Sequence, residues 1–147
     1  MRPPEKTDWI KVFFDGSSLG NPGPAGVGVV VLNGRGRLIF SGNRFLGKRT
    51  NNEAEYFALL FALEISRELG YKKILLHTDS TLLYSQVVGK YKVRAENLKK
   101  LHERAVKALS SFTWDMRWVP REENKKADKL AQKAAKIGGF NDEKDNC

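Results

Sequence analysis

The sequence predicts an α/β fold in which helices flank a five-stranded mixed sheet. Two observations support this prediction: three β-rich segments follow one another through turns near the start of the chain, and helical and strand patterns alternate after them. Strands joined by hairpins pair antiparallel, whereas strands joined through helices pair parallel. We therefore expect the first three strands to be antiparallel and the first, fourth and fifth strands to be parallel.

The first three strands are separated by turn-forming segments. The β-rich segment WIKVFFD (9–15) precedes a turn-dense loop, DGSSLGNPGPAG (15–26), and the second strand, VGVVVL (27–32), follows. The turn NGRGR (33–37) then leads into the third strand, LIFSGNRFL (38–46). These segments predict the antiparallel half of the sheet.

A long helix comes next, from Asn51 to about Leu69. Its residues are apolar nearly all round, which predicts a central helix covered by neighbouring elements, and Gly70 ends it. The fourth strand is KKILLHTD (72–79), and a short helix and an amphipathic helix follow it, over residues 80–89 and 95–109.

The last strand and the last helix close the predicted fold. The segment FTWDMRWV (112–119) alternates strictly between apolar and polar residues, so we expect Trp114 and Trp118 to belong to the core. The final helix is predicted from about Glu122 to Ile137. It completes the helices that flank the sheet.

Length and composition limit the possible functions. The 147 residues suit a single domain spanning residues 1–147, with its core at about 9–137 and flexible ends over 1–8 and 138–147. The longest apolar runs are too short to cross a bilayer, so no membrane association is expected. No secretory signal is visible and Cys147 is the only cysteine, which suits a reducing cytoplasm. The net charge of +9 favours nucleic acid as partner, although surplus lysine also serves solubility.

Two aspartates occupy equivalent places at the ends of predicted strands. Asp15 ends the first strand and Asp79 ends the fourth. Ligands of such sheets bind at the carboxyl ends of the strands, so the two carboxylates meet if those strands are neighbours. Singly, each also has a structural interpretation, because Asp15 precedes a glycine in a turn and Asp79 can cap the following helix.

Helix capping separates two nearby glutamates. Thr50 and Glu53 fit a capping box, in which each side chain bonds the backbone amide of the other, so Glu53 has a structural role. Glu55 has no such role. It begins an apolar stripe of the helix, where an unpaired carboxylate is costly unless a cation or a hydrogen-bond donor meets it.

The final helix carries a similar pair. Asn124 and Asp128 are four residues apart and share a face with small alanines. Asp128 is either part of the acidic group or only the partner of Lys125 or Lys129. Four acids near one spot repel one another unless a divalent ion binds them, and oxygen-only ligands select Mg²⁺ or Mn²⁺.

In combination, four motifs resemble the ribonuclease H type 1 family over about Val12 to Ala135. They are DGS with GNPGPAG, TNN followed by a glutamate, TDS, and an asparagine four residues before an aspartate. The resemblance is to short, archaeal-type members without a basic protrusion. It implies the ribonuclease H-like fold and an endoribonuclease that hydrolyses the RNA strand of RNA/DNA hybrids, leaving 5′-phosphate and 3′-hydroxyl ends. It also implies two Mg²⁺ or Mn²⁺ ions roughly 4 Å apart, held by Asp15, Glu55, Asp79 and Asp128.

The resemblance also assigns substrate-binding residues. Ribose 2′-hydroxyls, which mark RNA, would be contacted by Gly16, Ser17, Asn51, Asn52 and Glu55. Asn21 and Thr50 match the family's pocket for a DNA phosphate, although a turn role and a capping role explain them equally well. Asn124 is included in the substrate-binding set. Trp118 could alternatively sit against the sugar backbone.

Two departures from the best-known bacterial pattern follow. The connection GKYKVRAE (89–96) replaces a long basic insertion, so binding would rely on other basic residues: Lys90, Lys92, Arg94, Lys99 and Lys100. The loop PREEN (120–124) lacks the family's histidine. We expect this short loop to bring Arg121 beside Asp128, where it is the nearby cation that could assist turnover, unless it only pairs with Glu122 or Glu123.

Two alternative functions remain open. One is a nuclease of the same fold that acts on double-stranded RNA or on DNA, and the other is a catalytically silent module that only binds the hybrid. We expect a monomer without an obligate protein partner.

Overall fold

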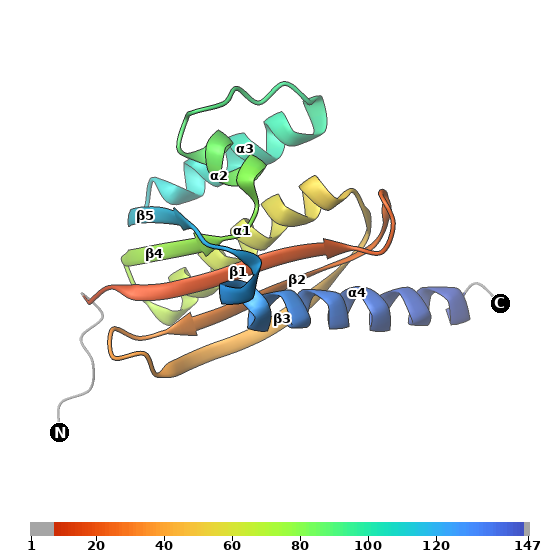
Figure 1. The fold of residues 1–147 in the computed structure, drawn as a ribbon, viewed down its shortest axis with the longest axis horizontal. Helices are drawn as coiled ribbons and strands as arrows, with labels where there is room; N and C mark the ends of the chain where they lie inside the picture. The colour runs from red at the N-terminus through yellow and green to blue at the C-terminus, as the bar shows by residue number, and fades with distance from the viewer. Residues whose placement is uncertain (1–7, 146–147) are drawn as a thin grey trace.

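The computed structural model describes residues 8–145 and confirms the mixed five-stranded sheet (Figure 1). The strand order is β3-β2-β1-β4-β5, with β1–β2 and β2–β3 antiparallel and β1–β4 and β4–β5 parallel. The elements in chain order are β1 (Ile10–Ser18), β2 (Gly23–Leu32), β3 (Leu38–Arg49), α1 (Asn51–Leu69), β4 (Lys73–Thr78), α2 (Thr81–Val87), α3 (Glu96–Leu109), β5 (Thr113–Trp118), the 3₁₀ helix η1 (Arg121–Asn124) and α4 (Lys125–Asp145).

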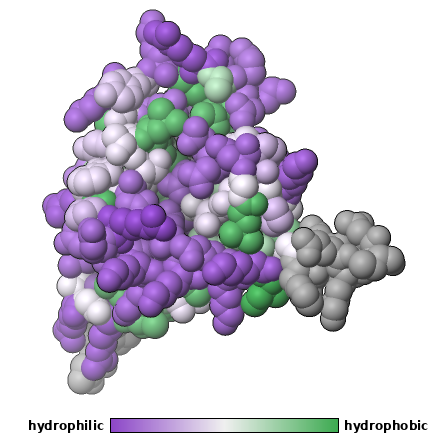
Figure 2. All heavy atoms as spheres, turned by 45° about the vertical axis from the view of Figure 1, so that its right-hand side comes forward, coloured by the Kyte–Doolittle hydropathy of each residue, from purple (hydrophilic) through white to green (hydrophobic). Residues whose placement is uncertain are grey.

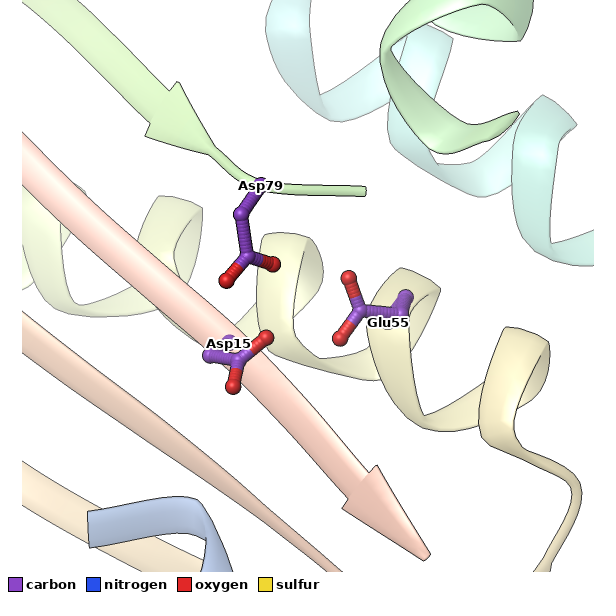
Figure 3. Close-up of side chains that lie close together, drawn as sticks. All are labelled: Asp15, Glu55 and Asp79. Carbon is purple, nitrogen blue, oxygen red and sulfur yellow. The ribbon is translucent and has the colours of Figure 1, made fainter. Parts of the chain in front are cut away.

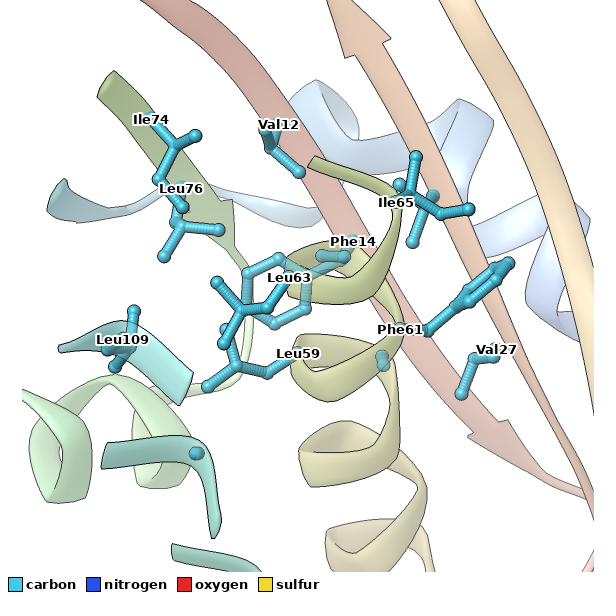
Figure 4. Close-up of a cluster of buried hydrophobic side chains, with 14 of the residues drawn as sticks. Val12, Phe14, Val27, Leu59, Phe61, Leu63, Ile65, Ile74, Leu76 and Leu109 are labelled. Carbon is cyan, nitrogen blue, oxygen red and sulfur yellow. The ribbon is translucent and has the colours of Figure 1, made fainter. Parts of the chain in front are cut away.

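Helices cover both faces of the sheet. Helix α1 packs on β1 and β2 from one side, with α3 against it, and α4 crosses β1, β2 and β3 on the other side (Figure 1). The main core lies between the sheet and α1 (Figure 4), where β1 contributes Val12 and Phe14 and α1 contributes Leu59 and Leu63. The prediction of a central, covered α1 is therefore confirmed, and Gly70 ends it in a left-handed conformation (φ 84°). Among residues 8–145, no helix is long and apolar enough to span a bilayer.

The predicted loop over residues 15–26 was largely wrong. Strand β1 continues to Ser18 and β2 begins at Gly23, because residues Asp15 to Ser18 pair with Gly28 to Ala25. Glycine and proline signalled a turn, but only the residues between Ser18 and Gly23 make it. The antiparallel partner satisfies the backbone groups of the other residues.

The predicted end of the last helix at Ile137 was also wrong. Helix α4 continues to Asp145, through two glycines that usually weaken a helix. Here the missing side chains allow close packing, since a Cβ on Gly138 would lie 2.1 Å from the ring of Phe45. The predicted flexible head falls almost wholly on residues 1–7, outside the described residues.

Helix α4 also lies close to β2 because two strand positions lack side chains. Gly26 and Gly28 share the face of β2 toward α4, two residues apart. A Cβ on Gly28 would lie 2.3 Å from the carbonyl oxygen of Ala127, and one on Gly26 would lie 2.5 Å from that of Ala131. The alanines predicted to face the sheet are buried there. Since Asp128 lies in the first turn of α4, this packing positions one wall of the site described below.

We expect Gly28→Ala to lower the free energy of unfolding by about 1–3 kcal/mol or more, because the helix backbone must move to admit the methyl group. Gly34→Ala is the matched control, since its nearest neighbour lies at an ordinary 3.5 Å. Chemical denaturation of both variants measures the difference. Equal stability of the two variants would show that α4 shifts freely on the sheet.

The expectation that Trp118 belongs to the core was wrong. In β5, Met116 is buried and Trp114 packs against the core, but Trp118 is 48% exposed. Strand β5 is the edge of the sheet, and Trp118 is its last residue.

Candidate active site

The register of β1 and β4 brings Asp15 and Asp79 together, as predicted. The last pair of this parallel ladder is Phe13 with His77, and each aspartate lies two residues further along its own chain, on the same side of the sheet. Asp15, Asp79 and Glu55 each offer an oxygen, and these oxygens lie within 4.8 Å of one another (Figure 3). Asp15 does not lie at the end of β1. It lies just beyond the last residue of β1 that pairs with β4. Its carboxylate lies beside those of Glu55 and Asp79 (Figure 3).

The start of α1 separates the two glutamates as expected. The Glu53 amide donates to Thr50 Oγ1 (3.1 Å) and the Thr50 amide donates to Glu53 Oε1 (2.8 Å), so the capping box is confirmed. The hydrogen bond from the Thr50 backbone holds the pKa of Glu53 below its ordinary value. Glu53 is thus committed to the helix end, and Glu55 turns toward the aspartates (Figure 3).

Glu55 reaches the site because Gly16 lets β1 approach α1. A Cβ on Gly16 would lie 2.3 Å from the carbonyl carbon of Ala54, so this position needs glycine. The Gly16 amide donates to Glu55 Oε1 at 2.7 Å. Oε2 of the same carboxylate is buried and has no hydrogen-bond partner. An unpartnered buried carboxylate oxygen is costly by itself and is explained if a cation binds it.

Burial, with a contribution from neighbouring negative charge, disfavours the ionised form of the carboxylates. Burial, followed by the negative charge of Glu55, raises the pKa of Asp15 far above its ordinary value of 3.8. Burial raises the pKa of Glu55 from 4.5 to about 7, against the opposing effects of the Asp15 side chain and of the Gly16 hydrogen bond. Burial is also the largest cause of the raised pKa of Asp79. Three acids that resist ionisation at one place form a site that a divalent cation would stabilise.

Asp128 lies at the side of this group. Its charge helps to raise the pKa of Asp79, while its own carboxylate accepts from Gln132 Nε2 at 3.0 Å. Arg121 Nη2 lies 3.5 Å from Asp128 Oδ2, as expected from the short PREEN loop. The structure therefore pairs Arg121 with Asp128 rather than with a neighbouring glutamate. The proposed partnership of Asp128 with Lys125 or Lys129 is replaced by contacts with Gln132 and Arg121.

Asn124 was expected to bind substrate, but the structure buries it, with 1% of its surface exposed. Its Nδ2 donates to the Phe14 carbonyl at 2.9 Å, beside Asp15. A hydrogen bond from Asn124 also lowers the pKa of Asp79. The residue thus anchors the start of α4 to β1 and to the site, which leaves it no open surface for a substrate.

The other predicted substrate-binding residues surround the start of α1. Asn21 Oδ1 accepts from the Asn51 amide at 3.1 Å, so the β1–β2 turn caps the same helix end as Thr50. The turn role of Asn21 and the capping role of Thr50 are thus both confirmed, and a role of Asn21 and Thr50 in binding a DNA phosphate stays a prediction. Ser17 is half-buried and Asn52 is exposed. The surface on this side of the molecule is mostly hydrophilic (Figure 2).

These elements enclose an open pocket of about 370 Å³ over the carboxylates. Eight residues line it: Asp15, Asn51, Glu55, Asp79, Ser80, Trp118, Arg121 and Asp128. Ser80 was not selected from the sequence, although it belongs to the TDS motif. It caps α2 by accepting from the Leu83 amide at 3.2 Å. The four predicted carboxylates and Arg121 all line this pocket.

Together, the fold and the site define an α/β protein with a carboxylate centre of the kind that binds divalent cations. A family model described as reverse transcriptase-like matches residues 13–134. Ribonuclease HI of Halobacterium salinarum is 39% identical over 132 residues, 89% of this chain and 66% of that protein. Ribonuclease H of Mannheimia succiniciproducens is 31% identical over 143 residues, 90% of this chain and 88% of that protein. The chain belongs to the ribonuclease H type 1 family.

Solved structures agree with this assignment. RNase H1 of Halobacterium salinarum matches with a TM-score of 0.86 at 39% identity, over 88% of this chain and 98% of that chain. LC11-RNase H1 in complex with an RNA/DNA hybrid matches with a TM-score of 0.83 at 32% identity, over 88% and 98%. The chain spans 66% of the Halobacterium ribonuclease HI and 35% of a bifunctional Mycobacterium tuberculosis protein that is 38% identical.

Proposed function

We propose that this chain hydrolyses the RNA strand of RNA/DNA hybrids with the help of two Mg²⁺ or Mn²⁺ ions, leaving 5′-phosphate and 3′-hydroxyl ends. The observation that carries the proposal is the close set of carboxylates from β1, α1 and β4, with its buried and unpartnered Glu55 oxygen. The Halobacterium ribonuclease HI and the LC11-RNase H1 complex with a hybrid support the choice of substrate.

The residues present fit divalent cations. Their donors are all carboxylate oxygens, which suit Mg²⁺ and Mn²⁺. Burial is the largest cause of the raised pKa values of Asp15 and Asp79, neighbouring negative charge adds to it, and a bound cation would offset both effects. Asp15, Glu55 and Asp79 would hold one ion, and Asp15 with Asp128 the other. Such ions activate a water molecule and stabilise the departing oxygen.

The chain's own groups would place the RNA strand over this centre. Asn51 lines the pocket and Asn52 is exposed beside it at the start of α1, where side-chain amides can bond a ribose 2′-hydroxyl. Exposed basic residues around α3 would attract the phosphates. Gly16 keeps Glu55 in place through its backbone amide.

Strand-labelled cleavage of a hybrid, of double-stranded RNA and of double-stranded DNA, each with and without Mg²⁺, tests the function. We expect Mg²⁺-dependent cleavage of the RNA strand that needs several consecutive ribonucleotides opposite DNA, because only the 2′-hydroxyls mark RNA. Binding should weaken as salt rises, through released counterions. Equal cleavage of all-DNA duplexes would contradict the proposal. Faster cleavage of double-stranded RNA than of the hybrid would favour the alternative nuclease that acts on double-stranded RNA. Binding of the hybrid without cleavage would favour the catalytically silent module.

Arg121 should assist turnover from the side of Asp128. Arginine stays protonated near neutral pH, so it would hold a phosphate or ease product departure rather than act as a base. We expect Arg121→Ala to lower turnover more than about tenfold, or ~1.4 kcal/mol, with little change in hybrid affinity. Arg121→Lys should recover part of the loss. Normal turnover of the alanine variant at saturating substrate would remove Arg121 from the mechanism.

A monomeric state and a cytoplasmic location complete the proposal. Gel filtration with light scattering measures the first, and fractionation of the source cells the second.

A further inference from the structure

Trp118 is a large apolar side chain in the wrong place for the core. Its register partner in β4 is Thr78, the residue before Asp79, so it stands at the edge of the sheet where the carboxylates gather. A tryptophan that is 48% exposed forgoes much of the free energy that burial would provide. Its position needs an explanation other than packing.

The ring is held firmly despite its exposure. The indole Nε1 donates to the backbone carbonyl of Asp79 at 3.2 Å, which ties one edge of the ring to the backbone of that residue. Of the eight residues that line the pocket, seven are polar or charged and Trp118 is the exception. A tethered aromatic ring offers apolar surface at little cost in conformational entropy.

We propose that Trp118 contacts the substrate, with its indole packed against the base or ribose of the RNA nucleotide next to the cleaved phosphate. This inference rests on the proposed function, because the pocket over the carboxylates must then hold the strand that is cut. Arginine, and cations held by the carboxylates, can recognise phosphate, but a nucleoside also presents flat apolar surface. Trp118 is the pocket residue that matches it.

An apolar contact differs from a phosphate contact in its response to salt. In a plot of the logarithm of affinity against the logarithm of salt concentration, each lost phosphate contact makes the slope shallower. A lost stacking contact leaves the slope unchanged and weakens binding by the same factor at every salt concentration. This difference separates a nucleoside contact from an indirect electrostatic effect of the same substitution.

The test compares Trp118→Ala, Trp118→Phe and Trp9→Ala. Trp9 is a matched control, since it is 43% exposed but precedes the first residue of β1, at the end of that strand away from Asp15. Binding to an RNA/DNA hybrid is measured in EDTA over a range of salt, and KM and kcat are measured in Mg²⁺. We expect Trp118→Ala to weaken affinity and raise KM about tenfold with an unchanged salt slope. Trp118→Phe should stay within about threefold of the wild type, because the aromatic face remains.

Wild-type affinity and KM in Trp118→Ala would overturn the inference, and so would a salt slope that changes by one phosphate contact. A wild type that binds the hybrid in EDTA but does not cleave it would instead overturn the proposed function, and the binding data would still test Trp118. If the wild type cleaves the hybrid and Trp118→Ala keeps the wild-type affinity and KM, the inference about Trp118 is wrong and the proposed function stands.

Fluorescence provides a direct readout. The chain has three tryptophans, so replacing Trp9 and Trp114 by phenylalanine leaves Trp118 as the reporter. We expect hybrid binding to quench its emission, saturating at the affinity measured independently. Emission that does not change while the hybrid is bound would show that no nucleoside reaches the ring.

Discussion

Asp15→Asn should abolish Mg²⁺-dependent cleavage, by more than about a thousandfold or ~4 kcal/mol in activation free energy. The amide keeps the shape of the carboxylate but loses the charge needed to bind both proposed ions. Asp115→Asn, on the exposed surface of β5, is the control and should cleave normally. Near-normal activity of Asp15→Asn in Mg²⁺ would rule out the bridging role of Asp15.

The same variant should be more stable than the wild type when divalent ions are absent. Because burial and Glu55 raise the pKa of Asp15, the folded state retains a proton that the unfolded state releases. The stabilisation is complete below the unfolded pKa of about 4 and is lost as pH rises toward the folded pKa. The melting temperature of metal-free wild type should therefore fall more steeply than that of Asp15→Asn above about pH 4. Mg²⁺ should raise the melting temperature of the wild type more than that of the variant.

Glu55→Gln should be as inactive as Asp15→Asn, whereas Glu53→Gln should remain active. Glutamine at position 55 can still accept from the Gly16 amide, so the fold is kept while the ligand charge is lost. Glutamine at position 53 can still complete the capping box. The two variants make the same chemical change two residues apart, which makes each the control for the other. Parallel cleavage assays and melting curves measure the outcome. An active Glu55→Gln together with an inactive Glu53→Gln would show that Glu53, and not Glu55, is the metal ligand.

The start of α1 illustrates what local sequence can predict. The capping box joins Thr50 and Glu53 through hydrogen bonds between residues that are three positions apart. Both partners therefore lie within one short sequence motif, and the motif is enough to predict the interaction. The apolar character of α1 and the alternation in β5 likewise predicted which elements exist. The meeting of Asp15 and Asp79 followed from topology alone, since adjacent parallel strands end at the same edge.

Strand boundaries and buried polar groups required the structure. Glycine and proline predicted a loop after Asp15, yet β1 and β2 extend because each satisfies the other's backbone. Gly138 would end most helices, but here it admits Phe45 from β3, which lies far away in the sequence. In both cases the deciding partner lies beyond the reach of a local pattern.

The sequence by itself predicted the class of fold and the capping of α1, because these depend on periodicity and short-range hydrogen bonds. Its motifs selected the four carboxylates through their resemblance to a known family. Only the tertiary structure decided that Asn124 is buried against Phe14 and that Trp118 stands open beside Asp79. The first hydrogen bond joins η1 to a residue of β1 that lies 110 positions earlier, and the second joins β5 to a residue 39 positions earlier, both beyond the reach of a local pattern.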